Sequence, residues 1–455
     1  MSTLWVPDAS LDRRMLAYTV GDDPVWDARL LRWDILGSLG HAAGLRRARL
    51  ISEAEYRRMQ RGLRAALRAA RAGELVIGPE HEDVHSAVEL WLTDRHGAIG
   101  ERLHTGRSRN DQIAADLRLY LKHEVLELHA LALELAQALL AFARRHAGDL
   151  WPGYTHQRRG MPSSAGAWAA GYAEGVLDTA EAVAGLWPRL DRSPLGSAAG
   201  YGVPLPLDRE ATARALGFSG LDHAVTSVQG SRGKLEAAVL FWCVQFGHDV
   251  GRLAADVILY SAEEFGYLVL PPDLATGSSI MPQKRNPDLF ELTRARAAAV
   301  QGELAGTLAI AGKLTGGYHR DFQLLKAPLM RGLASTRQML EMVTIAVPRL
   351  GVDAARGFAA LEGPTLATDE VMRRVRNGTP FRRAYREVAG AVKAGEEMPA
   401  LSRREIMAAR KSAGGIGNPG LGAARGRLRA ARAWNARERR RFERALQALA
   451  GGKGR

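Results

Sequence analysis

The sequence predicts an all-α protein built around a central bundle of long helices, and two observations support this. Apolar residues recur every three or four positions over long stretches, whereas the period-two alternation of half-buried strands is scarce. Five stretches are long enough to cross a domain: 113–147, 164–190, 234–265, 289–313 and 328–347. Long amphipathic helices bury their apolar faces against one another, so these stretches favour a helical bundle.

Composition places the chain among globular proteins and away from several other classes. Its 455 residues are 46% hydrophobic and 25% charged, which is typical of soluble domains. A single cysteine, Cys243, cannot form an internal disulfide and does not indicate a thiolate metal cluster. The first sixteen residues lack a signal-type apolar stretch, and charges interrupt the later apolar runs. We therefore expect a cytoplasmic protein that does not bind membranes.

The net charge of +14 raises nucleic acid as a partner, because clustered Lys and Arg release counterions from phosphates. Most arginines alternate with acids along the expected helices, and aromatic residues make up only 6% of the chain. A dedicated nucleic-acid site is therefore not predicted. The arginine-rich tail from Arg425 onward is interpreted as a solvated basic helix.

Three helical units are expected along the chain: 1–107, 108–358 and 359–455. The first unit should contain an amphipathic helix over 27–43 and a second helix opened by a capping box of Ser52 and Glu55. The 108–358 unit holds the long helices. Beyond Gly351 the helices shorten, and a glycine-rich break near 414–422 indicates a small C-terminal domain that carries the basic tail.

The most informative polar stretch is 275–288, ATGSSIMPQKRNPD. Its glycine, serines and prolines predict a mobile loop without regular structure. The loop offers the hydroxyl of Ser278, the cation of Lys284, the amide of Asn286 and free backbone N–H groups. Those groups can bind a carboxylate and handle a proton.

Two further stretches combine cations with hydroxyls and amides near helix starts. In 103–112, LHTGRSRNDQ, Arg107 and Arg109 could form a fork for carboxylates, and Asn110 or Asp111 could cap the next helix. In 82–89, EDVHSAVE, His85 lies four residues before Glu89 and hence on the same helix face. From these residues alone, a plain basic loop explains 103–112 as well as a binding site does. A surface ion pair of His85 with Glu89 likewise explains 82–89 as well as a functional role does.

Two more segments carry isolated polar residues whose pattern alone is ambiguous. The loop at 153–162, GYTHQRRGMP, contains Thr155 and His156, and a lone loop histidine is more often structural than catalytic. The segment 318–326, YHRDFQLLK, holds Tyr318, Gln323 and Lys326 and would otherwise be an ordinary helix start.

Taken together, these motifs resemble the fumarase/aspartase superfamily. The 275–288 loop is similar to its signature loop, and the run LHTGRSRNDQ is similar, almost letter for letter, to the form found in argininosuccinate lyases. The motifs follow one another in the family's order over most of the chain. The resemblance implies a homotetramer whose long helices share one bundle, with each active site assembled from three subunits. It also implies a small-molecule substrate and neither a metal nor a cofactor.

The activity that the resemblance implies is a reversible anti-elimination that converts argininosuccinate into arginine and fumarate, a step of arginine biosynthesis. Ser278 and His156 match the family's proton-transfer residues, and Lys284 would stabilise the doubly charged carboxylate formed when the proton leaves. Which of Ser278 and His156 is base and which is acid stays open. The residues implied in substrate binding are Arg109, Asn110, Ser108, Thr155, Asn286, Tyr318, Gln323, Lys326, His85 and Asp23.

Within that set, Arg109, Asn110, Asn286 and Lys326 suit the carboxylates of the succinyl half of the substrate. Tyr318, Gln323 and Asp23 are the expected acceptors for the arginine half. Asp23 stands where the family has a serine, and the stretch 227–234 lacks the acidic residues of the family form. The alternatives are a lyase that acts on another succinyl amine and, from a different class, a structural protein that reuses the scaffold.

Overall fold

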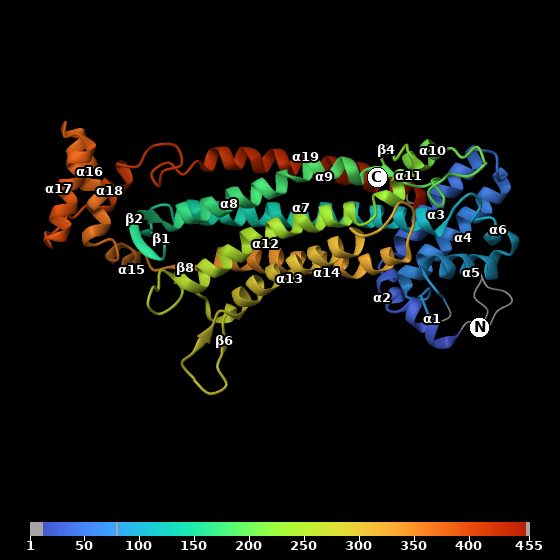
Figure 1. The fold of residues 1–455 in the computed structure, drawn as a ribbon, viewed down its shortest axis with the longest axis horizontal. Helices are drawn as coiled ribbons and strands as arrows, with labels where there is room; N and C mark the ends of the chain where they lie inside the picture. Colours follow the sequence, from blue (N-terminus) through green and yellow to red (C-terminus); the bar gives the residue numbers. More distant parts are fainter. Residues whose placement is uncertain (1–11, 79–80, 452–455) are drawn as a thin grey trace.

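The structure is a computed structural model that describes residues 12–78 and 81–451. It is elongated, with long helices running side by side along its length and smaller groups of helices at both ends (Figure 1). Residues 1–11, where the sequence predicts no targeting signal, lie outside the described residues, as does Pro79 at the expected end of the second helix.

The N-terminal end consists of short and medium helices whose capping matches the sequence pattern. Ser52 and Glu55 form the predicted capping box, and Gly73 ends that helix in a left-handed conformation at φ 76°. The helices are α1 (Arg13–Val20), α2 (Asp23–Asp27), α3 (Leu31–Arg47), α4 (Glu53–Ala72), α5 (Val84–His96) and α6 (Ala98–Glu101).

The central bundle confirms the five predicted long stretches, with one difference. The stretch 164–190 forms two helices that meet at Ala182, and the second contains Pro188. The bundle helices are α7 (Arg109–Arg145), α8 (Ala165–Glu181), α9 (Val183–Leu190), α12 (Lys234–Tyr260), α13 (Asp288–Ala311) and α14 (Lys326–Ala346). Two short helices, α10 (Arg209–Ala215) and α11 (Val225–Gly230), lie in the connection between α9 and α12.

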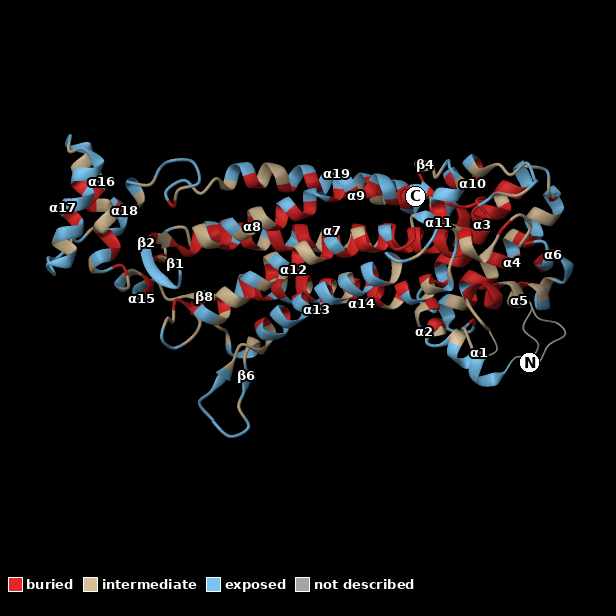
Figure 2. Ribbon diagram, viewed as in Figure 1, coloured by how far each residue is buried: buried red, intermediate tan, exposed pale blue. Residues whose placement is uncertain are grey.

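Helix α7 forms the axis of the core. It is long and apolar enough in composition to cross a membrane, but 61% of its most apolar window is buried inside the fold. It packs against α8, α14, α3 and α9. Burial by neighbouring helices on this scale is what a core helix requires, and Figure 2 shows α7 as the most continuously buried of the long helices.

The C-terminal region divides into two parts. The helices α15 (Ala354–Ala359), α16 (Ala367–Arg376), α17 (Phe381–Lys393) and α18 (Arg403–Ala408) form a small group beyond one end of the bundle (Figure 1). Helix α19 (Leu421–Ala450) instead returns along the bundle and packs against α7, α8 and α3. The interpretation of the tail as a solvated basic helix is therefore wrong.

Buried contacts explain why α19 docks despite its arginines. Its apolar face buries Leu428, Phe442 and Leu446. Asn435 donates a hydrogen bond to the backbone oxygen of Leu126 at 2.9 Å, and several arginines pair with acids on α7 and α8. Because the apolar residues recur at helical spacing beneath the charges, one face packs while the other stays in solvent. The division of the chain at residue 359 stays a prediction, but this packing favours counting α19 with the bundle.

Strands are few and short, as the sequence predicts, and form four two-stranded sheets among the described residues. They are β1 (Leu150–Thr155) with β2 (Arg158–Ser164), β3 (Arg192–Ser193) with β4 (Gly220–Leu221), β5 (Leu268–Val269) with β8 (Gly351–Val352), and β6 (Thr276–Gly277) with β7 (Arg285–Asn286). Four short 3-10 helices complete the fold: η1 (Pro272–Leu274), η2 (Arg320–Leu325), η3 (Val347–Arg349) and η4 (Gly363–Leu366). Two of the sheets, β1–β2 and β6–β7, occupy segments that the sequence predicts as loops.

Candidate active site

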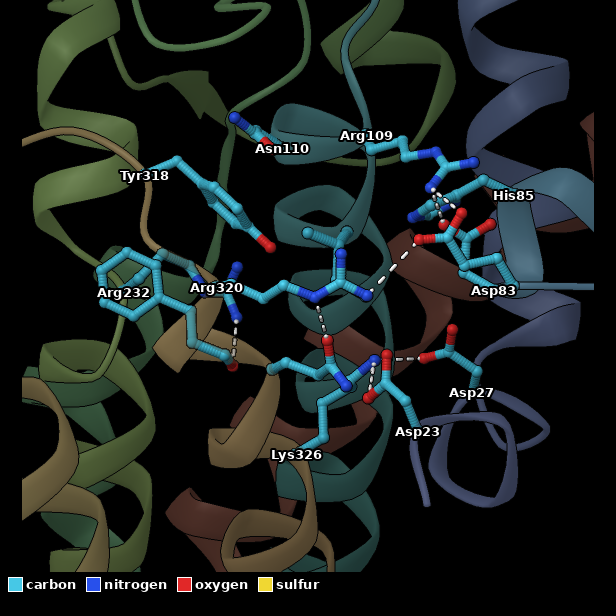
Figure 3. Close-up of a pocket in the computed structure, with 14 residues that line it drawn as sticks. Asp23, Asp27, Asp83, His85, Arg109, Asn110, Arg232, Tyr318, Arg320 and Lys326 are labelled. Atoms are coloured by element: carbon cyan, nitrogen blue, oxygen red, sulfur yellow. Dashed lines mark hydrogen bonds and ion pairs between the residues drawn. The ribbon is translucent and has the colours of Figure 1, made fainter. Parts of the chain in front are cut away.

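A charged pocket of about 180 Å³ lies at the N-terminal end of the bundle, where α2, α5 and the start of α7 meet η2 and the start of α14. It brings together seven of the predicted site residues: Asp23, His85, Arg109, Asn110, Tyr318, Gln323 and Lys326. Figure 3 shows these side chains converging from segments that are far apart in the sequence. The sequence prediction that they share a site is therefore consistent with their positions.

Lys326, the first residue of α14, is enclosed by two carboxylates. Its Nζ lies 2.6 Å from Asp23 and 2.5 Å from Asp27, and its side chain is only 4% exposed. Burial opposes the charge of Lys326, but the two acids outweigh it and raise its pKa. For Asp23, burial dominates and raises the pKa to about 6, although Lys326 counteracts this. The sequence analysis assigns Asp23 and Lys326 to opposite halves of the substrate, and this assignment stays a prediction; in the structure the two side chains pair with each other.

Arg109 is also paired within the pocket. Its guanidinium lies 2.9 Å from Asp83 and 3.3 Å from Glu82, and it donates to the hydroxyl of Ser86 at 2.9 Å. The predicted fork of two arginines does not form, because Arg107 points away from the pocket. Arg107 is 7% exposed and donates to the hydroxyl of Ser38. A bidentate site for a carboxylate therefore cannot be built from these two residues.

Ser108 serves the helix rather than the pocket. It is the N-cap of α7, where its hydroxyl accepts from the backbone N–H of Asn110 at 3.3 Å, and Asp111 accepts from the backbone N–H of Ser108 at 3.0 Å. The expected cap was Asn110 or Asp111, and the structure shifts it by two or three positions. The capping box points Arg109 and Asn110 at the pocket, so Ser108 positions the site without lining it.

A third cationic group of the pocket is Arg320, which lies in η2. It donates to the side-chain oxygen of Gln323 at 3.1 Å, to the backbone oxygen of Thr19 at 3.1 Å and to Glu82 at 3.4 Å. Gln323 in turn donates to the backbone oxygens of Thr19 and Val20, both at 3.0 Å. Gln323 thus holds the C-terminal end of α1 against η2. Its predicted function as an acceptor for substrate did not include this role.

His85 lies behind the pocket in a buried acidic environment. Its Nδ1 is 2.6 Å from Asp34 and 3.7 Å from Asp116. Burial works against the charge of the imidazole, but the carboxylate of Asp34 and the neighbouring acids more than compensate, so the pKa of His85 is raised. The predicted helix placement four residues before Glu89 is confirmed, but the surface ion pair with Glu89 is not: the partner is Asp34 on α3.

The group of Asp34, His85 and Asp116 has the side-chain atoms that could hold a metal ion, all within 4.8 Å of one another. Burial and the charge of Asp34 raise the pKa of Asp116 well above its usual value. In this group Asp34 Oδ2 accepts from the side-chain amide of Gln112 at 2.9 Å and lies 2.6 Å from His85 Nδ1. Asp34 Oδ1 and both carboxylate oxygens of Asp116 have no hydrogen-bond partner among the described residues. The expectation that the protein uses no metal stays a prediction.

Sequence reasoning missed five charged residues of the pocket: Asp27, Glu82, Asp83, Arg232 and Arg320. Arg232 lies two residues before α12 and is held by Glu236 at 3.0 Å, with its guanidinium 5.3 Å from the Phe322 ring. Glu82 and Asp83 belong to the 82–89 stretch, and Arg320 lies within the 318–326 segment. Their place in these stretches was the only available signal, since charge alone does not distinguish a pocket residue from a surface residue.

Thr155 and His156 lie on the β1–β2 hairpin at the other end of α7. The two strands pair up to Thr155 and Arg158, which leaves His156 and Gln157 as a two-residue turn. Both residues adopt positive φ, 52° and 57°, the conformation of a type I′ turn that usually contains Asn and Gly. Non-glycine residues held in this region carry backbone strain, and such strain often accompanies a functional position. Both His156 and Thr155 are exposed.

Ser278, Lys284 and Asn286 belong to the β6–β7 hairpin, which projects sideways from the bundle (Figure 1). The Ser278 hydroxyl oxygen accepts from the backbone N–H groups of Met281 at 3.1 Å and Ile280 at 3.4 Å. Ile280 at the tip is 83% exposed. The expected loop therefore has short paired strands at its base; Lys284 is exposed in the single chain, and Ser278 and Asn286 are partly buried.

The predicted site residues therefore form three clusters that a single chain keeps apart. Helix α7 carries Arg109 and Asn110 at its first turn and ends close to the β1–β2 hairpin; its 37 residues span roughly 55 Å. Helix α13 separates the β6–β7 hairpin from Tyr318, and its 24 residues span roughly 36 Å. These two helices therefore keep the pocket apart from both hairpins within one chain.

Comparison with known proteins gives the same family. Residues 24–302 match a family model described as lyase. Argininosuccinate lyase from Sorangium cellulosum is 43% identical over 418 residues, which cover 92% of this chain and 96% of the relative. Argininosuccinate lyase from Thermotoga neapolitana is 38% identical over 386 residues, covering 85% and 97% of the two chains.

Solved structures agree on the fold. EDDS lyase in complex with formate superimposes with a TM-score of 0.80 at 24% identity, over 97% of this chain and 95% of the other. Class II fumarase from Schistosoma mansoni gives a TM-score of 0.70 at 16% identity, over 86% and 91% of the two chains. The chain belongs to the fumarase/aspartase superfamily of lyases and, within it, to the argininosuccinate lyase family.

Proposed function

We propose that the protein cleaves argininosuccinate to arginine and fumarate, and catalyses the reverse addition, as a step of arginine biosynthesis. The observation that carries this proposal is the charge inventory of the pocket, which holds four acids and four permanently charged cations, with His85 behind them. Argininosuccinate combines an amino group and a guanidinium with three carboxylates. A pocket of interleaved acids and cations can pair with both kinds of group, whereas a purely basic one would suit a simple dicarboxylate.

Ser278 is proposed as the base that removes the proton from the carbon next to a carboxylate. Two backbone N–H groups already point at its hydroxyl oxygen, those of Ile280 and Met281. Such donors favour the deprotonated hydroxyl, and Lys284 in the same hairpin adds a positive charge. Lys284 and Asn286 would also stabilise the doubly charged carboxylate that the proton loss creates.

His156 is proposed as the acid that protonates the departing guanidinium nitrogen. Its place at the tip of a strained two-residue turn leaves the imidazole exposed and able to reach a neighbouring subunit. Thr155 beside it would help to hold the substrate. The reverse assignment, with His156 as base and Ser278 as acid, stays open. The chemistry is expected to use side chains alone, without a cofactor.

We further propose a homotetramer in which each active site takes its three clusters from three different subunits. Two features support it. The pocket and the hairpins lie apart within one chain, which favours sites completed by other copies, and the outer faces of α12, α13 and α14 carry exposed apolar side chains. Those side chains are Phe241, Leu259, Leu292, Leu308, Met342 and Ile345. Exposed apolar surface of this kind marks a subunit interface. A cytoplasmic location is proposed because the relatives are soluble metabolic enzymes.

The direct test is fumarate release by the purified protein, followed by ultraviolet absorbance, with argininosuccinate, aspartate and adenylosuccinate compared side by side. We expect kcat/KM to be highest for argininosuccinate. A higher kcat/KM for another succinyl amine would support the elimination reaction but contradict argininosuccinate as the substrate. The absence of turnover with all three would support the scaffold-reuse alternative.

Shared active sites have a test of their own. Subunits carrying Ser278→Ala and subunits carrying Lys326→Met should each assemble into inactive tetramers. When the two are dissociated together and reassembled, some sites receive an intact hairpin from one subunit and an intact pocket from another, and activity should return. Persistent inactivity of well-formed mixed tetramers would contradict the sharing of these two clusters, as would a monomer in light scattering at micromolar concentration.

A further inference from the structure

Arg320 places a guanidinium inside the pocket, and this group is the same as the one that the proposed substrate carries. Figure 3 shows its side chain extending across the pocket between Tyr318 and Lys326. The guanidinium is bound by three kinds of acceptor: the amide oxygen of Gln323, the backbone oxygen of Thr19 and the carboxylate of Glu82. These acceptors lie on one edge of the guanidinium, along its Nε and one terminal nitrogen.

This set of acceptors is what a substituted guanidinium needs. The group donates up to five hydrogen bonds in a fixed plane and accepts none, so it binds best where an amide, a carbonyl and a carboxylate lie along one edge. The resting pocket therefore contains a formed guanidinium subsite, and a residue of the chain itself occupies it.

Arg320 forms part of the wall of the pocket, whose volume is about 180 Å³ with this side chain in place. Arg320 is able to leave. Its side chain is 52% exposed, it lies in the short η2 helix, and the backbone before η2 passes through Gly317 at φ 96°. Its hydrogen bond to Glu82, at 3.4 Å, is also the longest of the three.

Resting on the proposed function, we propose that Arg320 is an internal competitor for the guanidinium of the substrate. It keeps Glu82, Gln323 and the Thr19 carbonyl in position while the site is empty, and the guanidinium of argininosuccinate or arginine displaces it on binding. Glu82 is then a residue that determines specificity, because its second partner, Arg109, remains 3.3 Å away and holds the carboxylate in the pocket. Ligands without a guanidinium leave Arg320 where it is.

The test uses calorimetric binding of arginine and of citrulline to the full assembled protein. Citrulline has the same shape but a neutral ureido group in place of the guanidinium. Arg320→Met keeps the length of the side chain and removes the competing charge. We expect it to tighten arginine binding about 5- to 10-fold, the equivalent of one or two released hydrogen bonds, and to leave citrulline binding unchanged. Arg320→Lys, which keeps a charge without the planar fork, should fall between Met and wild type.

The matched control is Lys313→Met, which removes a 70% exposed cation near the same segment and outside the pocket. It should leave the affinity for both ligands unchanged. Weaker arginine binding in Arg320→Met would mean that Arg320 contacts the ligand directly, and an equal change for arginine and citrulline would mean a purely structural role; either result overturns the inference. Because binding is measured without turnover, arginine binding with no cleavage of argininosuccinate would overturn only the proposed reaction.

Discussion

The pocket and the two projecting hairpins differ in how far a single chain completes them. In the pocket, Lys326 and Arg109 are paired with acids at 2.5–3.3 Å, and Lys326 is almost fully buried. In the hairpins, Ser278 has only backbone donors for partners, and Lys284 and His156 face solvent. The cations of the pocket are therefore already paired with acids without substrate. The hairpins carry the proposed proton-transfer groups but lie apart from the pocket within one chain.

This difference separates binding from proton transfer. Buried ion pairs are held by the fold itself, so removing one partner affects stability as well as binding. Groups on an exposed hairpin contribute almost nothing to the fold, so their substitution affects only the reaction. The comparison therefore predicts which variants should lose activity alone and which should also lose stability.

The largest expected effect is on the rate. Ser278→Ala and His156→Asn should each lower kcat by about 10²–10⁴-fold, the usual contribution of a positioned proton-transfer group. Helix content by circular dichroism and tetramer mass by light scattering should match those of wild type, because neither side chain is part of the core. Turnover close to normal in Ser278→Ala would refute its proposed role as base.

A matched pair of lysines tests the contrast directly. Lys326→Met leaves Asp23 and Asp27 buried without a cation and should cost about 3–5 kcal/mol of unfolding free energy. Lys284→Met removes an exposed cation and should change stability by less than about 0.5 kcal/mol, while it still abolishes turnover. Urea unfolding of both variants measures the difference. Equal destabilisation would show that the hairpin is as much a part of the folded core as the pocket.

The contribution of the pocket to the stability of the fold should also depend on pH. Burial raises the pKa of Asp23 from 3.8 to about 6, so between these values the folded chain holds a proton that the unfolded chain has released. Stability from this group is thus present below pH 3.8 and lost as the pH rises through 6, by up to about 3 kcal/mol. Asp23→Asn should flatten this part of the curve of melting temperature against pH. An unchanged slope would assign the titration to another group.

The smallest expected effect concerns the strain in the β1–β2 turn. Gln157→Gly replaces a residue held at φ 57° with one that adopts this conformation freely. It should stabilise the protein by about 1 kcal/mol, which a rise in melting temperature would record. The substitution Gln157→Ala at the same position, which retains the strain, is the control. Equal effects of Gly and Ala would show that the turn is relaxed.

Sequence alone determined the secondary structure of the bundle and the residue types of the site. The apolar repeats located α7, α12, α13 and α14 closely, because a helix has one period and its buried face repeats with it. Ser52 with Glu55 marked the start of α4 for the same local reason. The signature stretches identified the chemistry, since hydroxyl, imidazole and ammonium groups in loops are needed for proton transfer.

Only the tertiary structure decided which charges pair. That Lys326 meets Asp23 and Asp27, and that His85 meets Asp34, depends on contacts between residues 51 to 303 positions apart. No local sequence pattern identifies such partners, because an aspartate on a helix surface and an aspartate in a pocket are the same residue in the sequence. The docking of α19 was missed for a related reason: its arginines dominate the composition, while only eight of its 30 residues are buried and hold it to the bundle. Long-range packing, which sums many weak contacts, overrides the average polarity of a segment.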